Sequence, residues 1–279
     1  MLEKFFTKEA PLLGLLGLGG GIARGGAAAG PLLVSGGNSY FEDSTYSWYV
    51  FTSPGNLVVA DQSRGSALTG LVVGGGGGGG ADGPSRERTT GGGGGVAFFE
   101  VPADDFTATT YPVTVGSGGG HAPNMESDNY PGGYSQFTKS GVYSVRGNGG
   151  GAGASYTKRP QAAPGGSGGG ADPGPYTPNT GGSATQPGAN PGVPWVKQQW
   201  GTPGGQPGPG GSGNYGGNPG FAGVPTPIHP DFQSTSVSAL PPYYSPTGIS
   251  YGRRDTNGLQ SPGGNGVVIV RTLLRTGPA

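Results

Sequence analysis

Few residues of this 279-residue chain have the type and spacing that catalysis requires. The segment Gly165–Gly169 fits the G-x-S-x-G pattern of a serine nucleophile, which needs an apolar strand before it and a helix after it. The preceding residues, Gln161–Pro164, do not form such a strand. Because 66 of the 279 residues are glycine, patterns built on glycine arise here by chance. The sequence therefore predicts no catalytic site, and we expect the protein not to be an enzyme.

Histidines and carboxylates are too sparse to indicate a metal centre. The chain has two histidines, His121 and His229, both in predicted loops, and it has no cysteine. Asp104-Asp105 and the Glu126–Asp128 pair could each hold a calcium ion together with loop carbonyls, although solvated carboxylates of turns are the simpler interpretation. We therefore expect no metal and no other cofactor.

Aromatic side chains are the remaining candidates for a functional site. Trp195 and Trp200 are five residues apart, and Tyr243-Tyr244 follows two prolines. Flat rings on rigid loops could bind a sugar or a receptor at low entropic cost. Alternatively, these rings fill gaps in a scaffold with few large side chains, or they form contacts between subunits. Four more tyrosines lie beside glycine or proline: Tyr130, Tyr134, Tyr176 and Tyr215.

The charge balance argues against nucleic-acid binding. Fifteen basic and fifteen acidic residues give a net charge of zero, so the chain has no excess of positive charge to attract phosphates. The basic residues are also scattered rather than interleaved with aromatic residues in one stretch. We expect no nucleic-acid partner.

Residues 1–30 are predicted to be a separate N-terminal segment, and residues 31–279 one glycine-rich domain. Met1–Ala10 could form a short amphipathic helix that ends at Pro11, and Pro11–Ala29 is apolar but too short and too rich in glycine to span a membrane. We interpret the segment as an anchor that docks into a partner protein, with targeting or membrane roles as alternatives. The expected anchor residues are Leu2, Phe5, Phe6, Leu12, Leu13, Leu15, Leu16 and Ile22.

Glycine runs flanked by strand-forming residues dominate the domain. Gly74–Gly80 follows the apolar Leu71–Val73, and Gly91–Gly95 leads directly into Val96–Phe99. Flexible linkers lie in polar surroundings, so we expect these glycines inside the folded body, where backbones approach one another closely. Neighbouring extended left-handed helices of the polyproline II type could then pair their backbone N–H and C=O groups.

The remaining pattern predicts strands and almost no helix. No segment after residue 10 has helical periodicity, and Ser53–Asn56 has proline and glycine at the centre of a predicted type II turn, which indicates a hairpin. We expect the first strands and the closing strand to lie together. The fold class is thus mainly β, with a small antiparallel sandwich-like scaffold and a glycine-rich bundle of left-handed helices. The expected strands are Tyr46–Phe51, Leu57–Val59, Ala67–Val73, Val96–Val101, Tyr111–Val115, Val142–Arg146 and Val267–Leu274.

Five of these segments together resemble the glycine-rich domain of tailed-bacteriophage tail-fibre and virion proteins. The resemblance covers about residues 46–274 and implies a small β scaffold that opens into stacked glycine-rich helices, with variable loops at the exposed end. In some phage adhesins of this kind the loops contact the bacterial receptor, and related domains occur in bacterial surface proteins and receptor ectodomains. The segments are Val50–Val59, Leu71–Gly80, Gly91–Val96, Thr109–Gly120 and Gly263–Arg271.

The resemblance implies a structural protein of the virion. We expect a tail fibre or adhesin component that attaches to the particle through its N-terminus and presents loops to the host cell. The expected partners are other virion proteins, further copies of the chain, and a bacterial surface glycan or outer-membrane protein. Three alternatives stay open: a head or neck fibre or decoration protein without receptor contact, a cellular surface or matrix adhesion protein, and, last, a hydrolase.

Overall fold

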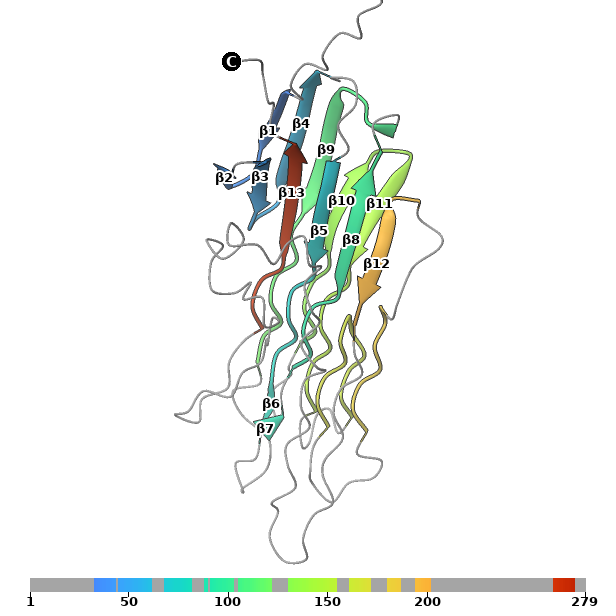
Figure 1. Ribbon diagram of the computed structural model, residues 1–279. Helices are drawn as coiled ribbons and strands as arrows, with labels where there is room; N and C mark the ends of the chain where they lie inside the picture. The colour runs from blue at the N-terminus through green and yellow to red at the C-terminus, as the bar shows by residue number, and fades with distance from the viewer. Residues whose placement is uncertain are drawn as a thin grey trace, which may run out of the picture.

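The protein is described by a computed structural model (Figure 1). Within the described residues the chain forms strands and extended segments and no α-helix, which confirms the mainly β class. No helix among these residues could therefore cross a membrane. The described residues are 33–43, 45–61, 68–81, 88–89, 91–102, 105–121, 130–154, 161–171, 180–186, 194–201 and 263–273.

Two antiparallel sheets stack face to face in the upper part of Figure 1. Their strands are rich in valine, phenylalanine and tyrosine, which favour the pleated, half-buried surface of a sheet. The six-stranded sheet has the order β12 (Val196–Trp200), β8 (Val96–Val101), β5 (Leu68–Val73), β13 (Val267–Leu273), β3 (Tyr46–Phe51) and β2 (Ser39–Glu42). The five-stranded sheet has the order β1 (Leu33–Gly36), β4 (Gly55–Asp61), β9 (Thr109–Thr114), β10 (Ser135–Lys139) and β11 (Tyr143–Gly147).

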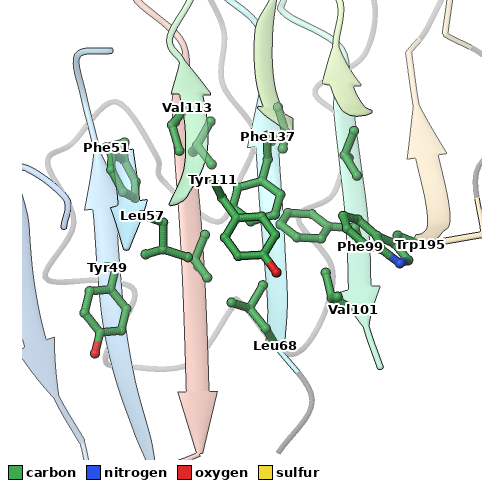
Figure 2. Close-up of a cluster of buried hydrophobic side chains, with 14 of the residues drawn as sticks. Tyr49, Phe51, Leu57, Leu68, Phe99, Val101, Tyr111, Val113, Phe137 and Trp195 are labelled. Carbon is green, nitrogen blue, oxygen red and sulfur yellow. The ribbon is translucent and has the colours of Figure 1, made fainter. Parts of the chain in front are cut away.

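The main core lies between the two sheets (Figure 2). Alternate residues of each strand point into it, because successive side chains of a strand face opposite sides of the sheet. Aromatic rings stack across the layer: the ring centroids of Phe99 and Phe137 lie 4.9 Å apart, and those of Tyr111 and Phe137 lie 5.4 Å apart. The sandwich-like scaffold expected from the sequence is therefore present.

The outer faces of the two sheets differ. A second buried cluster lies on the outer face of the six-stranded sheet and contains Trp48, Val50, Leu71, Val73, Val96, Phe98, Val267 and Ile269. On the five-stranded sheet, the outward positions of β9 are Thr110, Pro112 and Thr114, and all three are exposed. Among the described residues, the outer face of the five-stranded sheet is therefore the more open of the two.

Most predicted strands are confirmed, but the predicted hairpin is wrong. β3 pairs with β2 and β13 in one sheet, whereas β4 pairs with β1 and β9 in the other. Ser53–Asn56 therefore carries the chain between the sheets, and Gly55 does not have the positive φ that a type II turn requires. The pairing of β3 with β13 confirms that early and closing strands lie together.

Glycine-rich segments continue the strands beyond one end of the sandwich and form a bundle (Figure 1). Gly74–Gly80 follows β5, Gly91–Gly95 leads into β8, and residues 116–121 follow β9. The short pair β6 (Gly80–Ala81) and β7 (Arg88–Thr89) lies at the end of the bundle away from the sheets. The glycine runs are thus part of the folded body, as the sequence predicts.

Backbone hydrogen bonds hold the bundle together, and their partners repeat every three residues. The amides of Gly74 and Gly77 donate to the segment 92–95, and those of Gly75 and Gly78 donate to the segment 130–133. The amide of Gly76 donates to a third neighbour, the carbonyl of Gly264, at 2.9 Å. Each glycine run is therefore surrounded by several others.

Only glycine fits at most of these positions. A Cβ atom on Gly74, Gly75, Gly77 or Gly78 would lie under 3.0 Å from a backbone carbonyl of a neighbouring segment. Real Cβ atoms do not approach backbone so closely, so the absence of a side chain is what permits this spacing.

Candidate functional site

Trp195 lies in the core, which corrects the expectation of a receptor contact for this residue. Its side chain is 0% exposed, and its indole N–H donates to the Asp105 carboxylate at 3.0 Å. The Tyr143 ring packs against it with the ring centroids 4.9 Å apart. Trp195 is inaccessible at the surface of the chain because it closes the core beside β8, as the packing alternative proposed.

The other predicted site residues lie wholly or partly outside the described part of the chain. Trp200 ends β12, where its backbone lies opposite Val96, and its side chain is outside the described part. Tyr243 and Tyr244 also lie outside the described residues. So do all the predicted anchor residues: Leu2, Phe5, Phe6, Leu12, Leu13, Leu15, Leu16 and Ile22.

The residues that resembled catalytic or metal sites have structural roles where they are described. Ser167 is 2% exposed inside the bundle, where its amide donates to the carbonyl of Gly93 and its carbonyl accepts from the amide of Gly151. Asp105 is a partner of Trp195. Among the described residues no group of three or more histidines and carboxylates could hold a metal ion.

Two tyrosines project from a bundle segment whose backbone is fixed on three sides. Tyr130 and Tyr134 are 57% and 42% exposed. Their segment, 130–134, donates hydrogen bonds to the carbonyls of Gly120 and Ser117 on one side and of Gly150 on another, and its own carbonyls accept from the run at Gly75–Gly78 on a third. Both rings are exposed, and the Tyr130 ring lies beside Gly120.

Arg146 lies beside the Tyr134 ring. In β10 the inward positions are Ser135 and Phe137, so Tyr134 and Gln136 point outward, and Gln136 lies opposite Arg146 in β11. The guanidinium carbon of Arg146 is 3.9 Å from the centroid of the Tyr134 ring, a cation–π contact that holds the charge at the open face. We call Tyr134 and Arg146 the tyrosine surface.

A buried glutamine fixes the backbone beneath the tyrosine surface. Gln186 is 3% exposed at the junction between the sandwich and the bundle. Its amide nitrogen donates to the carbonyl of Arg146 at 2.8 Å, and its side-chain oxygen accepts from the amide of Asn148 at 2.7 Å. The end of β11 is therefore anchored on both sides of Gly147, which restricts the position of Arg146.

The sequence alone did not single out the tyrosine surface. The sequence pattern marks Tyr130 and Tyr134 only as rings next to glycine or proline, and Arg146 only as the end of the expected strand Val142–Arg146. The signal that could have found them is the alternation in the segment Tyr134–Thr138, where Ser135 and Phe137 occupy the inward positions. That alternation depends on recognising β10, which the sequence pattern did not predict.

Comparison with protein families finds one match that covers most of the chain. Residues 52–273 match the family described as a glycine-rich domain, which is most of the chain and contains all but the first strands of the sandwich. A search among curated proteins finds no match. The chain therefore belongs to the glycine-rich domain family.

Proposed function

We propose that this protein is a structural component of a tailed-bacteriophage virion, and that it serves in a tail fibre or adhesin. The observation that carries this proposal is the backbone lattice of the bundle, in which hydrogen-bond partners repeat every three residues. Three residues per turn is the repeat of a polyproline II helix, so we further propose that the glycine runs are left-handed helices of this type.

A lattice of this kind suits a fibre because it is stiff without large side chains. Main-chain hydrogen bonds connect the glycine runs to several neighbouring segments. The buried side chains of Gln186 and Ser135 connect this network to the sandwich by further hydrogen bonds. A protein that holds recognition loops far from its point of attachment needs a stiff scaffold between the two.

Several connections between bundle segments leave from the far end. Gly80, Thr89 and Ala154 meet there, since the Thr89 hydroxyl accepts from the Gly80 amide and donates to the Ala154 carbonyl. The connections that start or end near this level comprise residues 82–87, 122–129, 155–160 and 172–179. In the proposed function these segments, with Tyr243 and Tyr244 from the longer connection, contact a bacterial surface glycan or outer-membrane protein, and Trp200 at the end of β12 is a further contact.

Residues 1–30 supply the attachment to the particle in this proposal, and the chain acts together with other virion proteins and further copies of itself. No catalytic step and no nucleic acid take part.

Locating the chain in an intact particle tests the proposal. A small epitope tag at residue 279 and gold-labelled antibody should mark the tail of the particle, and the combined variant Trp200→Ala, Tyr243→Ala, Tyr244→Ala should reduce adsorption to cells without reducing particle yield. Label on the head or neck would instead identify a decoration protein, and a chain found in cell walls but not in particles would overturn the virion assignment.

A further inference from the structure

Residues 33–43 join the edges of the two sheets. β1 is the edge strand of the five-stranded sheet beside β4, and β2 is the edge strand of the six-stranded sheet beside β3. Between β1 and β2 the chain crosses from one sheet to the other. Gly36 has a φ of +130° at this crossing, and a Cβ on it would lie under 3.0 Å from the carbonyl oxygen of Asn56 in β4, so the position needs glycine. We call residues 33–43 the strap.

Asn38 ties the strap to the second crossing between the sheets, which leads from β3 to β4. The Asn38 side-chain oxygen accepts from the amides of Thr52 at 2.7 Å and Ser53 at 2.9 Å, and the side-chain nitrogen donates to the Ser53 hydroxyl at 2.8 Å. The backbone amide of Asn38 donates to the carbonyl of Val50 at 2.7 Å. One side chain therefore makes three hydrogen bonds that hold the two crossings together.

Both ends of the strap are bonded to β3. Near the start of the strap, the hydroxyl of Tyr49 donates to the carbonyl of Val34 at 3.0 Å. At the other end, the Asp43 carboxylate accepts from the amide of Tyr46 at 2.7 Å and from the indole N–H of Trp48 at 2.8 Å. The strap is thus fixed at its start, at its centre and at its end.

The strap lies where a pull on the N-terminal segment reaches the folded body. Leu33 pairs with Asp61, the last residue of β4, whereas Gly55 at the start of β4 pairs with Val113, close to where β9 continues into the bundle. The chain therefore enters β1 at the end of the sandwich away from the bundle (Figure 1). A force between this entry and the bundle runs along the strands. Because the hydrogen bonds of antiparallel strands are perpendicular to the strands, such a force loads the bonds between β1 and β4 together rather than one at a time.

We infer that the strap is a mechanical clamp, which transmits a pull on residues 1–30 into both sheets. The inference rests on the proposed attachment through residues 1–30, since a fibre that is fixed at one end and bound to a cell at the other is pulled along its length. It names the element of the fold that bears this load. The test below uses the isolated chain, so its result does not depend on whether the chain is found in a virion.

Single-molecule pulling at constant force tests the inference. The chain has no cysteine, so Gly30→Cys and His121→Cys give two unique attachment points, one before the strap and one at the end of the segment 116–121. The first event should be release of the strap, whose residues 33–43, at about 3.3–3.6 Å each, give an extension of about 36–40 Å. A first event with a clearly larger extension, in which the sheets unfold before the strap is released, would overturn the inference.

Two variants and one control test the role of Asn38. Asn38→Ala removes the three side-chain bonds and should speed release of the strap at a fixed force by about tenfold or more. Asn38→Asp keeps acceptors for the two backbone amides, so its release rate should fall between those of Asn38→Ala and the natural residue. Asn56→Ala, the matched control, removes the same kind of side chain from an exposed position of β4 and should change the release rate by less than about twofold.

A second attachment geometry separates a clamp from a general loss of stability. With Thr45→Cys in place of Gly30→Cys, the load enters the chain after the strap, because Thr45 lies between β2 and β3. Asn38→Ala should then leave the rate of the first event unchanged. Equal acceleration by Asn38→Ala in both geometries, or no acceleration when the chain is pulled from position 30, would contradict a clamp at the strap.

Discussion

Trp195 shows how one side chain can close a core and also satisfy a buried polar group. Its ring is packed by Tyr143, and its N–H bonds to Asp105, whose backbone carbonyl accepts a hydrogen bond from the Lys139 ammonium at 2.7 Å. Trp195→Ala should lower the free energy of unfolding by about 3–5 kcal/mol, as for other large aromatic residues removed from cores. Trp195→Phe should cost less, because it keeps much of the packing and loses the hydrogen bond. Urea unfolding followed by circular dichroism measures both, and a loss under about 1 kcal/mol for the alanine variant would contradict a core role.

Ionisation of Tyr49 should make the stability of the core fall at alkaline pH. Burial is the main cause that raises the pKa of Tyr49 to about 12, and the nearby Tyr40 and Glu42 raise it further. The Tyr49 hydroxyl donates to the carbonyl of Val34 at 3.0 Å, a bond that only the protonated form makes. Since the unfolded state ionises near pH 10, this contribution to stability is complete below pH 10 and is lost as the pH rises toward 12. The difference in unfolding free energy between the natural chain and Tyr49→Phe should therefore narrow over this range, and a constant difference would contradict the shifted pKa.

At the scale of the elements, the bundle places different demands on neighbouring glycines. A Cβ at Gly77 would lie under 3.0 Å from the carbonyl of Gly151, whereas a Cβ at Gly120 would meet only the Tyr130 ring, at an ordinary 3.4 Å. Gly77→Ala should destabilise the protein by about 1–3 kcal/mol or more, because the backbone segments must move apart. Gly120→Ala, the matched control, should be neutral or slightly stabilising, since alanine lowers the entropy of the unfolded chain. Equal thermal shifts for the two variants would argue against close backbone packing.

Elements rich in β-branched and aromatic residues could be predicted from the sequence, and elements that depend on their neighbours could not. Val96–Val101 and Val267–Leu273 carry their own strand signal. β10 (SQFTK) and β12 (VKQQW) are polar, and they become strands because β9, β11 and β8 supply hydrogen-bond partners. The tyrosine surface was missed for the same reason, since the contact of Tyr134 with Arg146 exists only once β10 pairs with β11.

The whole molecule is asymmetric, because its two outer faces bury different amounts of apolar surface. Ile269 is 0% exposed on the outer face of the six-stranded sheet, whereas Val58 is 38% exposed on the outer face of the other sheet. Ile269→Ala should therefore cost about 2–5 kcal/mol, as in a core. Val58→Ala, which removes a side chain of similar kind from a sheet, should change the unfolding free energy by no more than about 0.5 kcal/mol. Chemical denaturation compares the two, and a small effect of Ile269→Ala would show that the outer cluster contributes little to stability.

We expect residues 2–30 to be needed for attachment to the particle and not for folding of the glycine-rich body. All the hydrogen bonds described for the two sheets and the bundle join residues within 33–273, so deletion of residues 2–30 should leave the glycine-rich body folded. In the proposed function the deleted segment buries five aliphatic side chains against a partner, which would contribute on the order of 8–15 kcal/mol before entropic costs. The truncated chain should therefore unfold at nearly the temperature of the full chain and yet be missing from purified particles. A chain shortened at the other end, by residues 274–279, serves as the control and should still be incorporated. Normal incorporation of the chain that lacks residues 2–30 would show that the particle holds this protein through another surface.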